Sequence, residues 1–162
     1  MRAAADTNFL LKLAAGSSEC LECWGRIREC LPSPELIVLP TVLQELAVLK
    51  IKSPSLEVRE YAANAEASLL QWGMSVQTLT PVEHGLAEQI GSTIRSRGLL
   101  PWAERNDGLI IAEAALMQCD FLVSSDGHFM TMNKVILSQI LRDAHVKETL
   151  PVNPYLVKRV LT

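Results

Sequence analysis

Aspartate is scarce in this chain, and its positions indicate a site of chemistry. It occurs only at positions 6, 107, 120, 126 and 143. Asp6 interrupts an otherwise apolar run, AAADTNFLLKL, where an unpartnered buried carboxylate would cost several kcal/mol or take a raised pKa. Asp107 and Asp126 stand where predicted elements begin or end, and Glu45 stands in the first turns of a predicted helix. Each acid alone could be an ordinary cap, turn or solvated helix residue; the alternative is that a shared partner stabilises their charges.

Strands and helices alternate in the predicted order of elements. Apolar runs predict buried strands, and apolar residues at helical spacing predict helices. The predicted strands are Ala3–Asp6, Leu36–Leu39, Ser75–Leu79 and Phe121–Ser124. The predicted helices are Phe9–Ala15, Glu19–Leu31, one that opens at Pro40, one from Ser53 to about Trp72, Val82–Arg97, Asp107–Gln118, Val135–Arg142 and a short helix at Val157–Leu161. This alternation predicts an α/β fold with a mostly parallel sheet and right-handed crossovers.

Local signals predict where three of these helices begin or end. Asn8 is the expected cap of the first helix. Pro32 and Pro34 are expected to stop the second helix. Thr41 and Gln44 have the spacing of a capping box at the start of the third helix, so Glu45 follows that box by one residue.

The four acids are predicted to meet at one edge of the sheet. Asp6 and Asp126 follow strands, while Glu45 and Asp107 lie at helix starts. In an open parallel sheet these positions share one rim, where ligands bind. Four carboxylates in one pocket repel each other, and a hard divalent cation such as Mg²⁺ or Mn²⁺ removes that conflict while keeping several waters for substrate phosphates.

Four motifs, in this order, resemble the signature of the PIN-domain nucleases. They are DTNFLL at 6–11, PTVLQEL at 40–46, NDGLIIAEAAL at 106–116 and LVSSDGHF at 122–129. The resemblance implies a three-layer α/β/α sandwich with a central, mostly parallel sheet, as one PIN-like domain over residues 1–162. It also implies a metal-dependent endoribonuclease with RNA as substrate. Many bacterial members are VapC-type toxins, so it further implies an antitoxin protein as partner and a homodimer.

The resemblance assigns roles residue by residue. The catalytic and metal-binding acids of the family correspond to Asp6, Glu45, Asp107 and Asp126, which would hold Mg²⁺ or Mn²⁺. Asp126 would complete the shell of the first ion or hold a second one. The supporting residues are Thr7 and Asn8 after the first acid and Ser124 before the last. The sequence departs from the family at Gly108, where alanine is commoner, in the segment 53–98, and from Met130 onward.

Other residues have plainer interpretations. Cys20 and Cys23 have a zinc-like spacing, but the sequence holds no second pair of ligands, so we expect small buried apolar residues. We expect His128 to be structural or to lie at the edge of the cleft, and Glu104 to be exposed. Asn106 could reach a metal through water. Basic residues that could line an RNA path, but that more simply form a solvated face, are Lys50, Lys52, Arg95, Arg97 and Arg105.

Bulk properties narrow the class of protein. The 162 residues suit one domain, and 49% hydrophobic with 20% charged residues is typical of a soluble globular protein. No apolar run approaches the roughly 18 residues of a membrane span, and Asp6 and Lys12 interrupt the run that imitates a signal peptide. The cysteine pattern favours a reducing cytoplasm. The net charge of -3 provides no global basic field for nucleic acid.

Two alternatives stand beside the nuclease interpretation. A phosphatase of the haloacid dehalogenase type also places an Asp after its first strand, but it needs a second Asp where this chain has Asn8. A catalytically silent PIN module would bind RNA or a partner protein. Such a module gains nothing from the mutual repulsion of four acids.

Overall fold

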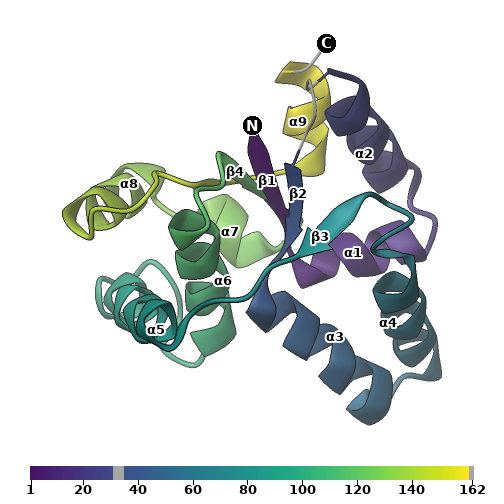
Figure 1. Cartoon of the computed structure of the whole chain (residues 1–162), viewed down its shortest axis with the longest axis horizontal. Coiled ribbons are helices and arrows are strands. Elements are labelled where there is room, and N and C mark those ends of the chain that lie inside the picture. The colour runs from purple at the N-terminus through teal and green to yellow at the C-terminus, as the bar shows by residue number, and fades with distance from the viewer. Residues whose placement is uncertain (31–34, 161–162) are drawn as a thin grey trace.

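The computed structural model describes residues 1–30 and 35–160, and a parallel sheet organises them (Figure 1). Its strands are β1 (Arg2–Ala5), β2 (Glu35–Val38), β3 (Met74–Val76), β4 (Phe121–Val123) and β5 (Leu150–Val152). They lie in the order β3-β2-β1-β4-β5, and every neighbouring pair is parallel. The predicted parallel sheet is therefore confirmed, with each of the four predicted strands within it.

Helices cover both faces of this sheet. They are α1 (Thr7–Ala14), α2 (Ser18–Cys30), α3 (Pro40–Lys52), α4 (Leu56–Ser68), α5 (Pro81–Ser96), α6 (Arg105–Leu116), α7 (Gly127–Thr131), α8 (Lys134–Asp143) and α9 (Pro154–Val160). Helices α1, α2 and α9 lie on one side of the strands and α5, α6 and α8 on the other (Figure 1). The predicted three-layer α/β/α sandwich is thus confirmed. In the described part of the chain, no helix is both long enough and apolar enough to span a membrane.

The central strand sets the position of the first acid. β1 pairs with β2 on one side and β4 on the other, and its residues Ala3, Ala4 and Ala5 are buried. Ala5 is in register with Val123, the last residue of β4. The chain changes sides of the sheet between β1 and β4, and in open α/β sheets ligands bind at such a switch point. Both Asp6 and the loop after β4 therefore lie at one carboxyl-end crevice.

The structure corrects two predicted helix caps. Asp6, not Asn8, caps α1, because its carboxylate accepts a hydrogen bond from the backbone N–H of Thr7. The capping box at Thr41 is wrong, because Pro40 already starts α3 and Leu39, which has no polar side chain, occupies the cap position. The predicted stop of the second helix at Pro32 and Pro34 lies outside the described residues.

Two elements near the C-terminus were not predicted. β5 is three residues long and contains Pro151, which sequence patterns disfavour in strands. As an edge strand it tolerates that proline. α7 is a single short turn after Asp126, too short to show a helical period in the sequence.

Helices α5 and α6 touch through two glycines. A Cβ at Gly108 would lie 3.0 Å from the carbonyl oxygen of Gly91, and a Cβ at Gly91 would lie 3.0 Å from the carbonyl carbon of Gly108. Glycine at both positions therefore allows the backbones to approach closely. This contact gives a physical reason for Gly108 where the resembling family more often has alanine, and it fixes the helix that carries Asp107.

Candidate metal centre and active site

One open cavity of about 440 Å³ lies at the carboxyl end of the sheet. It is lined by residues from α1, from α3, from the start of α6 and from the loop after β4. The lining includes all four predicted acids, Asp6, Glu45, Asp107 and Asp126. Thr7 and Asn8 line the same cavity, as do Glu104 and Asn106 before and within α6.

Asp6 is the most deeply placed of these acids. Its side chain is 3% exposed and accepts hydrogen bonds from the Ser124 hydroxyl and the Thr7 backbone N–H, both at 2.7 Å. Burial raises the pKa of Asp6 to about 7, although both hydrogen bonds act in the opposite direction. Charge repulsion from Glu45 and Asp107 contributes a smaller part of this rise in pKa. A cation in the cavity would reverse this balance by favouring the ionised form.

Glu45 is turned into the cavity by two polar neighbours. The Thr7 hydroxyl donates a hydrogen bond to Glu45 Oε2, and the Asn106 side-chain amide donates to Oε1 at 2.8 Å. Thr7 belongs to α1 and Asn106 to α6, so Glu45 on α3 joins three helices at the site. Thr7 therefore orients the Glu45 carboxylate.

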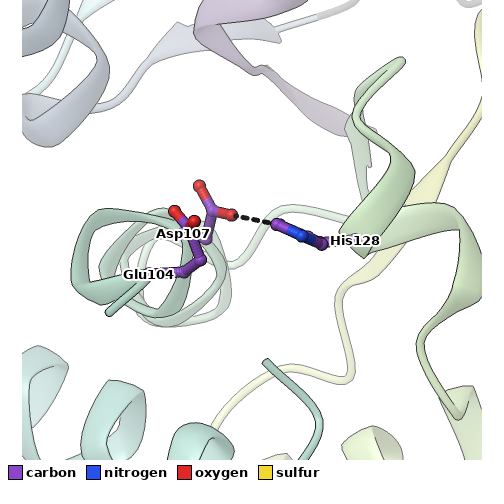
Figure 2. Close-up of side chains that lie close together, drawn as sticks. All are labelled: Glu104, Asp107 and His128. Carbon is purple, nitrogen blue, oxygen red and sulfur yellow. Dashed lines mark ion pairs between the residues drawn. The ribbon is translucent and has the colours of Figure 1, made fainter. Parts of the chain in front are cut away.

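Asp107 forms a group with Glu104 and His128 (Figure 2). Ligand atoms of the three side chains lie within 4.8 Å of one another, and His128 Nδ1 is 3.6 Å from Asp107 Oδ2. The pKa of Asp107 is raised to about 6, mainly by burial and then by charge repulsion from Asp126, Glu104 and Glu45. The contact with His128 acts in the opposite direction. The acids thus act on one another electrostatically, as expected of carboxylates that share one site.

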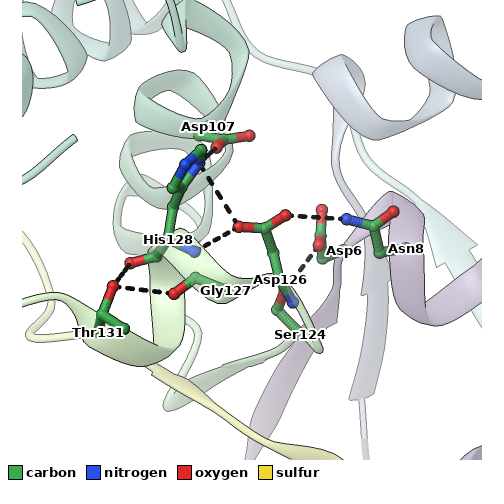
Figure 3. Close-up of polar contacts among 8 residues, drawn as sticks. All are labelled: Asp6, Asn8, Asp107, Ser124, Asp126, Gly127, His128 and Thr131. Carbon is green, nitrogen blue, oxygen red and sulfur yellow. Dashed lines mark hydrogen bonds and ion pairs between the residues drawn. The ribbon is translucent and has the colours of Figure 1, made fainter. Parts of the chain in front are cut away.

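Asp126 is held by local hydrogen bonds (Figure 3). It caps α7, since Oδ1 accepts from the His128 backbone N–H at 2.7 Å, and Oδ2 accepts from the Asn8 amide at 3.2 Å. The Ser124 hydroxyl bridges two acids, because it donates to Asp6 and accepts from the Asp126 backbone N–H at 3.0 Å. Asn8 therefore orients Asp126, and Ser124 couples the ends of β1 and β4.

Comparison with known proteins supports the resemblance at the level of fold. No protein-family model and no curated protein sequence matches the chain. VapBC2 from Rickettsia felis, in a structure bound to a DNA fragment from their promoter, matches with 13% identity and a TM-score of 0.63 over 94% of this chain and 98% of that chain. VapBC-1 from nontypeable Haemophilus influenzae matches with 16% identity and a TM-score of 0.61, over 95% of this chain and 98% of that chain. The chain has a PIN-like fold.

The donor set in this PIN-like fold suits a hard divalent cation. The cavity presents carboxylate oxygens from four separate elements, together with the amide side chains of Asn8 and Asn106. Mg²⁺ and Mn²⁺ prefer oxygen ligands, and one or two carboxylates with retained waters are enough to hold Mg²⁺. Burial, and then repulsion between the acids, raise the pKa values of Asp6 and Asp107, and a bound cation would offset both effects.

Two further residues beside the acids can be compared with their predicted exposure. Glu104 is half-buried and lines the cavity, so the prediction that it is exposed is wrong. It precedes Asp107 by three residues, a spacing that places side chains on one helix face and could have indicated the pairing. His128 is about half exposed beside Asp107 and Asp126, at the edge of the cleft as expected.

Cys20 and Cys23 lie away from the acids. Both are buried free thiols in α2, which confirms that they serve as small apolar residues. Burial raises the pKa of Cys23 to about 12, so its thiol stays protonated at neutral pH.

Proposed function

We propose that this chain is a divalent-metal-dependent endoribonuclease that hydrolyses phosphodiester bonds of RNA. The observation that carries the proposal is the meeting of Asp6, Glu45, Asp107 and Asp126 in one open cavity at the switch point of a PIN-like fold. We assign these four as the catalytic and metal-binding residues. They would hold Mg²⁺ or Mn²⁺, which would supply orientation of the scissile phosphate, a lowered pKa for the attacking water and stabilisation of the leaving oxygen.

The chain's own side chains hold that site in place. Asp6 is fixed by Ser124 and the start of α1, so its carboxylate is aimed before metal arrives. Thr7 and Asn106 turn Glu45 toward the cavity. Such outer hydrogen bonds orient ligands, and their loss typically costs 10- to 100-fold in metal affinity or activity.

The setting we propose is a toxin–antitoxin pair. Both neighbouring structures are VapBC complexes, and this chain covers 98% of each matched chain. The proposed partner is an antitoxin protein that blocks the acidic cavity. Expression of the wild type should arrest growth of a host cell, and Asp107→Asn should not; equal growth with both chains would count against a toxin.

Cleavage of labelled single-stranded RNA by the purified chain tests the nuclease directly. We expect cleavage with Mg²⁺ or Mn²⁺, none in excess chelator, and a loss of orders of magnitude in Asp107→Asn purified in parallel. That variant also controls for contaminating ribonuclease. Undiminished cleavage in chelator would remove the metal mechanism. RNA binding without cleavage in any metal would instead support the catalytically silent module.

A further inference from the structure

Trp102 is a large apolar side chain that the fold leaves in solvent. It is 65% exposed, whereas Trp24 is buried and Trp72 is half-buried. Among the described aromatic side chains, the only other exposed one is Tyr155, on α9. Tryptophan is highly buried on average, so an exposed indole on a chain with only 5% aromatic residues needs an explanation.

The exposed indole is held from one side. The guanidinium of Arg95, on α5, stacks over the Trp102 ring at 4.6 Å from its centroid. Arg95 Nη1 also donates a hydrogen bond to the Trp102 carbonyl oxygen at 2.9 Å, and Arg95 Nε donates to the Gly91 carbonyl at 3.4 Å. The ring therefore has a cation on one side and a large exposed area, and its position is set before any ligand binds.

Trp102 is close to the acidic cavity along the chain. It precedes Glu104, which lines that cavity, by two residues, so their Cα atoms are at most about 7.6 Å apart. A hydrogen bond from the Glu104 backbone N–H to the Pro101 carbonyl at 3.0 Å tightens this turn. α6 begins immediately afterward and carries Asp107 in its first turn. Trp102 therefore lies two residues from one cavity-lining acid and five residues from another along the chain.

Charge alone gives this chain little affinity for RNA. The net charge is -3, and the cavity itself is acidic. Two of the basic side chains that could line an RNA path form ion pairs: Arg105 pairs with Glu88, and Lys50 pairs with Glu66 at 2.5 Å. Stacking of a base on an aromatic ring does not depend on a basic surface and suits any of the bases.

We propose that Trp102, supported by Arg95, is a stacking platform for a nucleobase of single-stranded RNA next to the cleavage site. This inference rests on the proposed function, because the scissile phosphate, which joins the stacked base's nucleotide to the next one, would have to lie at the acidic cavity. The indole fixes the strand relative to the acids without reading its sequence. Trp102 is therefore a substrate-positioning residue and does not touch the reacting atoms.

Binding and cleavage measured separately test this platform. In the Asp107→Asn background, titration with a short single-stranded RNA should quench tryptophan fluorescence, and Trp102→Phe in that background should remove the quenching while keeping affinity within about threefold. Trp102→Ala should weaken binding at least about fivefold. Tyr155→Ala, which removes an exposed aromatic side chain on another helix, should leave binding unchanged.

Kinetics distinguish failure of the platform from failure of the nuclease. With Mn²⁺ and otherwise wild-type acids, Trp102→Ala should raise KM and leave kcat and the Mn²⁺-induced rise in Tm intact. An unchanged KM in that variant, or no RNA binding at all, would overturn the platform. Trp102-dependent binding without metal-dependent cleavage in any variant would support the platform and reject the nuclease.

Discussion

Replacing Asp6 by asparagine should stabilise the metal-free protein while it removes activity. The pKa of the buried carboxyl is raised from 3.8 to about 7, so the folded state opposes its ionisation. The free-energy penalty for keeping Asp6 ionised in the folded protein is absent below the pKa of this group in the unfolded chain. It grows as pH rises and is complete above the pKa of the group in the folded protein. A difference of about three pKa units between the folded and unfolded states lowers the free energy of unfolding by about 4 kcal/mol at pH 8, about 2 kcal/mol at pH 5 and less than about 1 kcal/mol at pH 4.

Asparagine fits the same position. It caps helices about as well as aspartate, so the bond from the Thr7 backbone N–H is retained. Its amide can donate to the Ser124 hydroxyl, which accepts in turn. Without a charge, Asp6→Asn avoids the pH-dependent penalty. At about 2 to 4 °C per kcal/mol, the variant should melt about 10 °C higher than wild type at pH 8 and almost equally at pH 4.

Thermal melts in chelator from pH 4 to pH 8 measure this difference. Asp120→Asn is the matched control, because the salt bridge with Lys147 and the bond from the Arg2 backbone N–H lower the pKa of Asp120. That group stabilises the fold above its unfolded pKa and loses this effect as pH falls, so Asp120→Asn should destabilise at pH 8. An Asp6→Asn protein that melts at or below the wild-type temperature at pH 8 would refute the electrostatic account.

Three further predictions concern the buried thiols of α2, the contact between α5 and α6, and the start of α3. Cys20→Ser combined with Cys23→Ser should keep RNA cleavage, because protonated buried thiols are poor zinc ligands; stoichiometric zinc in the wild type, lost in the double variant, would contradict this. Gly108→Ala should lower the free energy of unfolding by about 1 to 3 kcal/mol in a denaturant melt, because the added Cβ would clash with the α5 backbone at Gly91. Gly85→Ala, whose added Cβ would have no atom within 4 Å, should be neutral or stabilising. The Glu113 carboxylate accepts hydrogen bonds from the Thr41 backbone N–H and hydroxyl at the start of α3, so Glu113→Ala should cost about 1 to 3 kcal/mol and raise the Mn²⁺ concentration for half-maximal cleavage. Glu113→Gln should cost less, because its amide oxygen can accept from the N–H while its NH₂ donates to the hydroxyl; equal effects of both variants would contradict this support of α3.

The order of elements and the acids at their ends could be predicted because both depend on local sequence. Apolar runs identify β1, β2 and β4, and a parallel sheet brings their carboxyl ends to one edge whatever the intervening loops do. Asp6 was identifiable because a charge inside an apolar run demands a reason. Glu113 gives the same signal inside IIAEAAL, where its buried carboxylate accepts from the Thr41 backbone N–H and hydroxyl.

The remaining features depend on contacts between distant segments. The start of α3 is stabilised by Glu113, which is 72 positions away from Thr41, so the local capping pattern gave the wrong partner. His128 meets Asp107 only because β4 ends at the same rim of the sheet where α6 begins. β5 is short, contains proline and derives its pairing from β4, so tertiary structure rather than propensity determines it.

Calorimetric titration with Mn²⁺ tests most directly whether the converging acids form a metal site. The proteins to compare are wild type, Asp107→Asn and the control Asp120→Asn, whose carboxylate is not among the residues that line the cavity. We expect saturable binding by wild type, unchanged binding by Asp120→Asn and affinity at least about tenfold weaker in Asp107→Asn. Equal Mn²⁺ affinity in all three proteins, or no saturable binding in any of them, would contradict this expectation.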